Sequence, residues 1–484
     1  MCSSVPGHLI EAAREALAHQ GVGPGRRVVL EVDPDPVGVA WILAADATGA
    51  WVSPLNPGWT LPERRRILDR FQPHLYVTRT EEGGADSPEG TLRLSARRIL
   101  PCQGDAPGSR VVEGGGGTVG RGRGRELEGP DSSPFDVLEG GWLLWTSGST
   151  GTPRGVVLDR AAFRASARAS ALRLGLDRAD CWIASLSPAH VGGLALLLRA
   201  RDIGCSLVAP GPFDPEVFSS FLDDERVTHA SLVPVQLERV LEVRGDRPFQ
   251  DGLRTVLLGG AAASPELLAR AVEARIPVAS TWGMTEAASQ VATAPPPLVS
   301  EKAGTVGPPL DGLKVRRDPE SGELAVRGST MARGEFQGTG LAPTPLVDPE
   351  GWYWTGDVGR VDDDGHLWIT GRISERIVSG GVTVEPGEVE SVLTADRRVR
   401  EAAVVGLPDP EWGERPVALV VPEGPASPTL PDELSRDLRG LLSPAKRPRE
   451  VRVARELPRT STGKVDRAAV RELLHRGKGG STPP

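Results

Sequence analysis

Residues 146–155, which read Thr-Ser-Gly-Ser-Thr-Gly-Thr-Pro-Arg-Gly, are the stretch best suited to binding an anion. Gly148 and Gly151 permit backbone angles that other residues avoid, and their missing Cβ lets backbone N–H groups approach a phosphate closely. Arg154 adds a fixed positive charge. The stretch predicts a phosphate-binding loop, although its composition alone also fits a polar surface loop. It is not a Walker A sequence, because no Gly-Lys-Ser/Thr ends it. Its hydroxyl groups come from Thr146, Ser147, Ser149 and Thr150.

A second stretch, residues 281–286, reads Thr-Trp-Gly-Met-Thr-Glu and comes at the end of a strand predicted over 278–281. Ligands of α/β proteins bind where strands end. Trp282 offers a flat face for a purine, Thr285 a hydroxyl for a phosphate oxygen, and Glu286 a carboxylate suited to Mg²⁺. A buried tryptophan followed by a capping Thr/Glu pair is the structural alternative.

Four further places carry groups that could bind a nucleotide. The glycines of Gly259-Gly260-Ala261 let a planar base lie against the backbone, or they form a tight turn. Asp357 could accept hydrogen bonds from a pair of ribose hydroxyls that Arg372 shares, although either group alone is more often a solvated surface residue. Lys464 stands on a Gly/Ser/Thr loop in a chain with only five lysines against fifty-one arginines, where a surface lysine is the alternative.

The composition limits the class of protein. A chain of 484 residues predicts two or more domains, and 39% hydrophobic with 25% charged residues is typical of a soluble globular protein. A net charge of −8 argues against a general nucleic-acid binder. The first residues resemble no signal peptide, and the longest apolar runs are too short for a membrane span. The four cysteines form no CxxC pair, so we expect free thiols and a cytoplasmic protein.

The elements that must position these residues alternate between strands and helices. This alternation, over residues 8–71 and again over 161–281, predicts parallel sheets with crossover helices. Short strands predominate after about residue 300, and another α/β segment follows residue 372. We therefore predict an α/β fold with a large domain over 1–372, which includes a small β-rich part, and a small mobile α+β domain over 373–484. Residues 105–132 read as a flexible connection; their arginines could suggest RNA contact, but a solvated linker is favoured.

Taken together and in this order, these stretches resemble the motifs of the acyl-adenylate-forming superfamily, which includes acyl-CoA synthetases, luciferases and peptide-synthetase adenylation domains. The resemblance spans roughly residues 140–470. Three positions depart from the family pattern: Arg154 replaces a usual Lys, Trp282 replaces a usual Tyr, and Ser374 stands at the hinge where Asp or Lys is commoner. The departures leave open how these residues affect the rate and the hinge.

The resemblance implies an ATP-dependent acid–CoA ligase that uses ATP, Mg²⁺ and coenzyme A. It makes Lys464 the catalytic lysine, with Thr285, Glu286 and His190 as further catalytic candidates and Glu286 as the metal ligand. The loop Ser379-Gly380-Gly381 resembles the one that faces the active site during thioester formation, although a plain hairpin turn explains it equally. The nucleotide-binding residues implied are Thr146, Ser147, Gly148, Ser149, Thr150, Gly151, Arg154, Gly259, Gly260, Ala261, Thr281, Trp282, Gly283, Asp357, Arg372, Gly380 and Gly381.

Within the superfamily, residues 187–199, 228–237 and 256–262 resemble the o-succinylbenzoate–CoA ligases of menaquinone biosynthesis. That substrate has two carboxylates, of which the succinyl one is activated and the benzoate one must be held unreacted. Arg199 is the candidate for holding it, because arginine pairs with a carboxylate through two hydrogen bonds; a surface arginine near a helix end is the alternative. His190 and Ser289 could also contact the acid, and a structural role for His190 remains open.

Three other functions remain open: a CoA ligase for another carboxylic acid, an adenylation domain that loads a carrier protein, and a nucleotide-binding pseudoenzyme. The departures at Arg154, Trp282 and Ser374 motivate the last of these. We expect a small-molecule acid as the partner, with neither a nucleic acid nor a membrane involved. The sequence does not fix the oligomeric state, for which a homodimer is one option.

Overall fold

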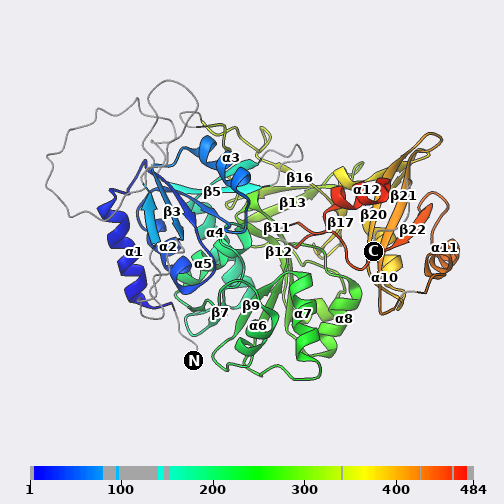
Figure 1. The fold of residues 1–484 in the computed structure, drawn as a ribbon, viewed down its shortest axis with the longest axis horizontal. Helices are drawn as coiled ribbons and strands as arrows, with labels where there is room; N and C mark the ends of the chain where they lie inside the picture. The colour runs from blue at the N-terminus through cyan, green and yellow to red at the C-terminus, as the bar shows by residue number, and fades with distance from the viewer. Residues whose placement is uncertain are drawn as a thin grey trace.

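The computed structural model describes residues 5–79, 94–97, 140–146, 153–338, 342–425, 427–460 and 463–476 (Figure 1). The predicted connection at 105–132 lies outside these residues. So do Ser147, Gly148, Ser149, Thr150 and Gly151 of the predicted phosphate loop, whose flanking strands are described.

The first large sheet has seven strands in the order β15-β6-β5-β2-β1-β3-β4. Its centre is parallel, since β1 pairs in parallel with β2 and β3, and β2 with β5. Strand β2 is buried along its whole length, as expected for a central strand of a sheet covered on both faces. The strands are β1 (Arg27–Glu31), β2 (Trp51–Leu55), β3 (Leu75–Arg79), β4 (Leu94–Arg97), β5 (Gly141–Thr146), β6 (Arg154–Asp159) and β15 (Gly334–Glu335).

The second large sheet has the order β12-β11-β10-β9-β7-β8, and all of its pairings are parallel except that of β12 with β11. The strand predicted over 278–281 continues to Met284, because β12 pairs with its second half. The prediction that the strand ends at residue 281 was therefore wrong: residues 282–284 continue it. The strands are β7 (Cys181–Ile183), β8 (Ser206–Val208), β9 (His229–Leu232), β10 (Thr255–Leu258), β11 (Val278–Met284) and β12 (Ser289–Ala294).

Helices α2, α4 and α5 join the two large sheets. A single core cluster includes Trp142 from the first sheet, Trp182 from the second, and apolar residues of these three helices. Helices α6, α7 and α8 pack in a separate core with the second sheet. None of the helices in the described part of the chain combines the length and apolar composition needed to cross a membrane. The helices are α1 (Gly7–His19), α2 (Pro36–Asp46), α3 (Leu61–Phe71), α4 (Arg160–Leu174), α5 (Val191–Ile203), α6 (Pro215–Phe221), α7 (Pro234–Arg244), α8 (Pro265–Glu273) and α9 (Pro296–Glu301).

A four-stranded antiparallel sheet follows, in the order β13-β14-β16-β17. Its importance for the site lies in one register: β16 and β17 pair so that Asp357 stands opposite Arg372. Two residues that are 15 positions apart in the sequence thus become neighbours. The strands are β13 (Leu313–Arg317), β14 (Glu323–Gly328), β16 (Tyr353–Val361) and β17 (Leu367–Arg372).

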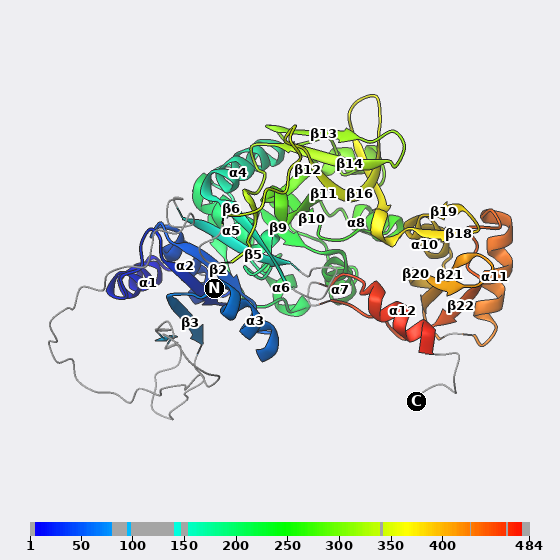
Figure 2. The ribbon, with the colours of Figure 1, turned by 90° about the horizontal axis from the view of Figure 1, so that it is seen from above.

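The rest of the chain forms a separate lobe, coloured from yellow through orange to red in Figures 1 and 2. The chain enters it through the 3₁₀ helix η2 (Ile373–Glu375), which contains Ser374. The lobe has its own apolar core between a five-stranded sheet and its helices. Its elements are β18 (Ile377–Ser379), β19 (Val382–Val384), α10 (Pro386–Thr394), β20 (Val399–Asp409), β21 (Gly413–Pro422), α11 (Leu430–Leu441), β22 (Glu450–Val453) and α12 (Arg467–Arg476).

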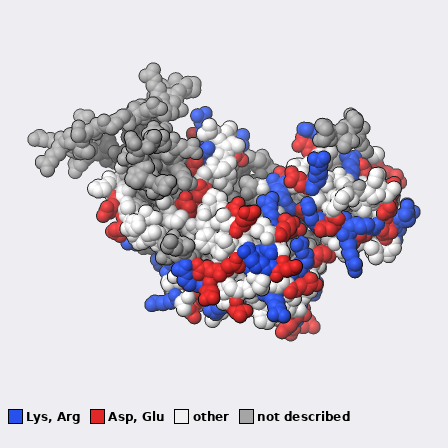
Figure 3. Space-filling view, turned by 60° about the horizontal axis from the view of Figure 1, so that its bottom comes forward, with Lys and Arg blue, Asp and Glu red and all other residues white. Residues whose placement is uncertain are grey.

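The predicted fold class, an α/β protein of parallel sheets with a β-rich part and a C-terminal α+β part, is confirmed. The separate core of the lobe supports a domain that begins after residue 372, which stays a prediction. On the face drawn in Figure 3, basic and acidic side chains are intermixed over the described surface.

Candidate active site

The carboxyl ends of β9, β10 and β11 lie side by side because these strands are parallel. Gly259 follows β10, and a Cβ on it would lie 2.6 Å from the Thr281 side chain of β11. Gly260 has a φ of +82°, which favours glycine. The backbone at Gly259 and Gly260 consequently carries no side chains at this strand end, which is what binding a flat base against it requires.

Trp282, Asp357 and Arg372 form one hydrogen-bonded group. The Trp282 Nε1–H donates to Asp357 Oδ2 at 2.8 Å, and Arg372 Nε donates to Asp357 Oδ1 at 2.5 Å. Asp357 is buried, whereas the Arg372 side chain is half exposed. The structure thus brings the predicted adenine residue and the two predicted ribose residues together.

Arg154 and Glu286 form an ion pair across the start of β6 and the 3₁₀ helix η1 (Thr285–Ala287). The Arg154 Nη2 contacts Glu286 Oε1, and its Nε lies 3.9 Å from Glu335 Oε2. The phenol of Tyr353 interacts with both partners, and burial together with the Glu286 charge raises the pKa of Tyr353 to about 12. Glu286 is 8% exposed and already holds a cation, so its carboxylate fits Mg²⁺ as an alternative partner.

The described edges of the predicted phosphate loop are fixed to each other. Thr146 ends β5, Arg154 begins β6, and the two residues pair in the antiparallel register. The Thr146 hydroxyl also donates to the Arg154 carbonyl at 3.3 Å. Both described edges of the loop therefore lie at the Arg154–Glu286 pair.

Lys464 reaches this group from the C-terminal lobe. The Lys464 side chain is exposed, and partial desolvation lowers its pKa; the charge of Arg372 lowers it further, and Asp357, Glu375 and Glu286 oppose this shift. The preceding Gly463 fits closely against α7, since a Cβ there would lie 3.3 Å from Val235 Cγ1. A positively charged side chain thus faces the carboxylates of the predicted nucleotide site.

His190 stands immediately before α5, and Lys464 lies close enough to act on its charge. Burial, with the Lys464 charge as the second cause, lowers the pKa of His190 to about 4, so the imidazole is neutral at pH 7. Its ring stacks edge to face with Trp59 at 6.3 Å between centroids. Nε2 of His190 and Oγ of nearby Ser185 are buried without a partner among the described residues. Two polar atoms beside α5 are therefore free to bind a ligand.

Arg199 lies in the interior of α5 and is only 2% exposed. The alternative of a surface arginine is thereby excluded. Its Nη2 donates to Gln290 Oε1 at 2.7 Å, its guanidinium covers the Trp182 ring at 5.0 Å, and Nε is buried without a partner. Burial lowers the pKa of Arg199 to about 10, which leaves it charged at pH 7.

Three predicted residues shape the chain near the end of β11. Ser289 starts β12 with a φ of 108°, and a glycine is required at position 283 because a Cβ there would overlap the Ser289 carbonyl. Thr285 begins η1 directly before Glu286. This tight reversal places Thr285, Glu286 and Ser289 at one end of the sheet.

Gly380 and Gly381 form the turn between β18 and β19, both with φ in the left-handed region. The Gly380 N–H donates to the Trp412 carbonyl at 2.9 Å, and a Cβ on Gly380 would overlap the Trp412 ring. The turn therefore packs within its own lobe, and no described contact joins it to Asp357 or Glu286.

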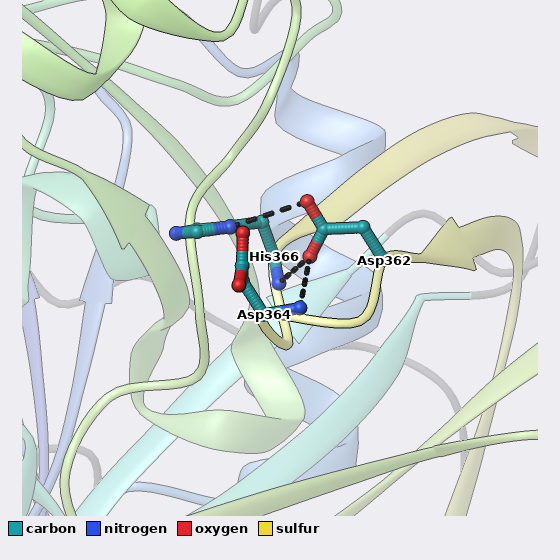
Figure 4. Close-up of side chains that lie close together, drawn as sticks. All are labelled: Asp362, Asp364 and His366. Carbon is teal, nitrogen blue, oxygen red and sulfur yellow. Dashed lines mark hydrogen bonds and ion pairs between the residues drawn. The ribbon is translucent and has the colours of Figure 1, made fainter.

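A cluster of Asp362, Asp364 and His366 has the spacing of metal ligands (Figure 4). Lys302 Nζ lies at its centre, 2.8 Å from Asp362 Oδ2, 2.7 Å from Asp364 Oδ2 and 2.9 Å from His366 Nδ1. The lysine ammonium supplies the positive charge that the carboxylates need. The cluster is a structural ion-pair network in the turn between β16 and β17.

Sequence reasoning missed Tyr353 and Gln290. Tyr353 lies four positions before the predicted site residue Asp357, so its place in the sequence could have drawn attention to it. Gln290 contacts Arg199, which is 91 positions away in the sequence. Only the three-dimensional fold brings this pair together.

Two family models match the chain. The model described as "AMP-binding enzyme" matches residues 8–335, and that described as "AMP-binding enzyme C-terminal domain" matches residues 388–464. The 2-succinylbenzoate–CoA ligase of Bacillus cytotoxicus is 36% identical over 348 residues, which cover 70% of this chain and 71% of that relative. These matches confirm the resemblance predicted from the motifs.

Solved structures agree over nearly the whole chain. The o-succinylbenzoate CoA synthetase (MenE) of Bacillus subtilis, in complex with the acyl-adenylate intermediate OSB-AMP, matches with a TM-score of 0.76 and 27% identity, covering 99% of this chain and 93% of that one. The same enzyme with ATP and a magnesium ion matches with a TM-score of 0.74 and 27% identity, covering 96% and 93%. The amide bond synthetase McbA of Marinactinospora thermotolerans also reaches 0.76 at 27% identity, covering 96% and 93%. The fold alone therefore does not select the reaction.

The Arg154–Glu286 pair predicts a competition between Arg154 and Mg²⁺. In an Arg154→Lys variant we expect half-saturation at a Mg²⁺ concentration about 3–10-fold lower, because a lysine makes a weaker pair with a carboxylate than the planar guanidinium does. The measurement is the Mg²⁺-dependent rise in melting temperature with ATP present, together with adenylate formation.

Glu335→Gln is the matched control, because it removes the more distant carboxylate and leaves the Arg154–Glu286 contact intact. An unchanged or higher Mg²⁺ requirement in Arg154→Lys would contradict the competition.

Proposed function

The chain belongs to the AMP-binding enzyme family, and we propose on this basis that it is an ATP-dependent o-succinylbenzoate–CoA ligase. The observation that carries the choice of acid is the buried charge of Arg199, which has no carboxylate partner among the described residues. An acid with a second carboxylate would supply that partner. The enzyme uses ATP, Mg²⁺ and coenzyme A, and the proposal places its reaction in menaquinone biosynthesis.

In the first step a carboxylate oxygen of the acid attacks the α-phosphorus of ATP, and pyrophosphate leaves. Asp357 and Arg372 would bind the ribose hydroxyls, and the backbone at Gly259 would support the adenine. The Lys464 ammonium stabilises the negative charge that shifts onto the phosphoryl oxygens during attack. Glu286 would hold Mg²⁺, which would supply positive charge to the phosphates.

In the second step the CoA thiol attacks the acyl carbon, and AMP leaves. In the present arrangement Lys464 faces the nucleotide residues, while the Gly380–Gly381 turn packs on Trp412. We propose that the C-terminal lobe rotates about Ser374 after the first step, so that the turn replaces the lysine. The exposed valines of this turn's strands, Val378 at 53% and Val382 at 43%, support the proposal, because they are free to be covered in a second arrangement.

The acid is proposed to lie between α5 and the end of the second sheet. Arg199 would hold the ring carboxylate, and the neutral His190, at the N-terminus of the same helix, would lie nearer the reacting end. Their separation along one helix matches a substrate that has to be oriented at two ends. Ser289 remains a proposed contact of the acid.

A CoA ligase for another carboxylic acid is the alternative function. The equal structural likeness to an amide bond synthetase favours keeping it, since that protein shares the fold and bears a different name. The proposal also includes a cytoplasmic location, which the free thiols of Cys181 and Cys205 support, and a homodimer remains an untested option.

The proposed function predicts strong discrimination between acids. With ATP, Mg²⁺ and CoA, we expect AMP and a CoA thioester to form from o-succinylbenzoate at a kcat/KM at least about tenfold above that for 4-oxo-4-phenylbutanoate, which lacks the ring carboxylate. Benzoates and medium-chain fatty acids complete the panel. Preferred turnover of one of these acids would agree with a CoA ligase but would contradict o-succinylbenzoate as its substrate.

Lys464→Ala should slow adenylate formation by about 10²–10³-fold, because the charge that stabilises the transition state is lost. Thioester formation from supplied acyl-adenylate should change much less. The two half-reactions are measured separately, by pyrophosphate release and by thioester appearance. Lys314→Ala, on exposed β13, is the control; equal loss of both half-reactions would contradict the proposed division of roles.

Arg199→Met keeps most of the buried volume and removes the charge. We expect KM for o-succinylbenzoate to rise about 10–100-fold, because a charge-assisted hydrogen bond is lost, while KM for 4-oxo-4-phenylbutanoate changes little. Arg201→Met, in the same helix but paired with Asp46, serves as the control. An equal rise in KM for both acids would contradict the proposed place of Arg199 in the substrate site.

A further inference from the structure

Arg199 is bound by an uncharged acceptor, whereas Arg244, the other arginine that is buried among the described residues, is paired with a carboxylate. Arg244, which is 4% exposed, pairs with Asp223 at 2.8 Å. Among the described residues, the hydrogen bond to Gln290 is the only one that Arg199 makes. An unneutralised guanidinium in the interior is costly, so its charge calls for a functional reason.

Gln290 is itself held rigidly. It is 2% exposed, its Oε1 accepts from Ser170 Oγ at 2.6 Å as well as from Arg199, and its Nε2 donates to Thr293 Oγ1 at 2.7 Å. An arginine can only donate, so the amide oxygen must face Arg199 and the amide nitrogen must face Thr293. The orientation of the amide is thereby fixed.

The row of hydrogen bonds that fixes Gln290 continues through Thr293 to Thr281, on the nucleotide side of the site. Thr281 Oγ1 donates to the Ala292 carbonyl at 2.8 Å, so its contact with Thr293 Oγ1 at 2.9 Å is one in which Thr293 donates. The Thr293 oxygen then accepts from Gln290. The direction of each hydrogen bond in this row is therefore fixed. The row runs from Thr281 on β11 to Arg199 on α5.

We propose that Gln290 is a positioning residue that fixes the Arg199 guanidinium while leaving its charge for the second carboxylate of the substrate. The inference rests on the proposed function. A carboxylate in place of the amide would hold Arg199 equally well but would neutralise it. The neutral acceptor therefore determines specificity for a dicarboxylic acid, and the Nε–H that lacks a protein partner is one of the groups left to bind it.

The test compares the kcat/KM ratio of o-succinylbenzoate to 4-oxo-4-phenylbutanoate in the full-length enzyme. In Gln290→Glu, which is nearly isosteric, we expect this ratio to fall about tenfold or more, mainly because KM for o-succinylbenzoate rises. The rate with the monocarboxylic acid should stay within a few-fold of that of the unmodified enzyme. Ser170→Ala is the matched control, since it removes the other donor to the same oxygen and should leave the ratio nearly unchanged.

A double-mutant cycle shows whether Gln290 acts through Arg199. In an Arg199→Met background, Gln290→Glu should produce no further change in the ratio. If circular dichroism shows that the Gln290→Glu protein does not fold, Gln290→Met replaces it in the test, because it removes the acceptor without adding charge. Gln290→Met should also lower the kcat/KM ratio.

The outcomes separate the two ideas. An unmodified enzyme that does not discriminate between the two acids contradicts the proposed function. An unmodified enzyme that prefers o-succinylbenzoate, together with Gln290 variants that keep the full preference or lose it equally in the Arg199→Met background, overturns the role of Gln290 and leaves the proposed function standing.

Discussion

The ion pair between Asp357 and Arg372 is the contact on which the arrangement of the site depends. It follows from the antiparallel register of β16 and β17, which fixes the two residues opposite each other. Asp357 also receives the Trp282 indole, which ties this sheet to the end of β11. Arg372 is the last residue of β17 and directly precedes the 3₁₀ helix η2, so the same pair joins the proposed nucleotide residues to the start of the C-terminal lobe.

The charges around this pair are balanced in a way that suits anionic substrates. Arg154 and Arg372 are each neutralised by a carboxylate, Glu286 and Asp357, that is itself proposed to bind magnesium or ribose. Lys464 faces both carboxylates without a described ion pair, and Arg199 has a neutral partner. A triphosphate and a dicarboxylic acid would thus meet two cations whose charge is free and two whose partners can be exchanged. Partly buried charges of this kind are costly to keep unpaired, which explains why the pairs form within the protein.

Local sequence signals were sufficient for many elements and for the residue types of the site. The start of helix α3 follows from local residues, because Thr60 and Glu63 form a capping box and Pro62 favours the first turn. The length of β11 was not predictable, since its second half is a strand only through pairing with β12. The burial of Arg199 could not be read from periodicity, because α5 is apolar on nearly all sides. Gln290 and Tyr353 gain their roles from partners far away in the sequence, a relation that no local pattern contains.

The contacts that hold the Lys464 backbone in place come from the C-terminal lobe, not from the site that the lysine faces. Its carbonyl accepts from the Thr460 N–H at 2.8 Å, and the carbonyl of Gly463 accepts from Arg459, which contacts Glu401 on β20. Polar contacts help to hold the lobe against the large domain, such as Arg376 with the Ser321 carbonyl at 2.6 Å. Interfaces of this kind permit relative motion of domains, because little apolar surface has to be exposed when they separate. In the proposed rotation, a lysine fixed to such a lobe would enter and leave the site together with it, which is the property that a reaction in two steps at one site requires.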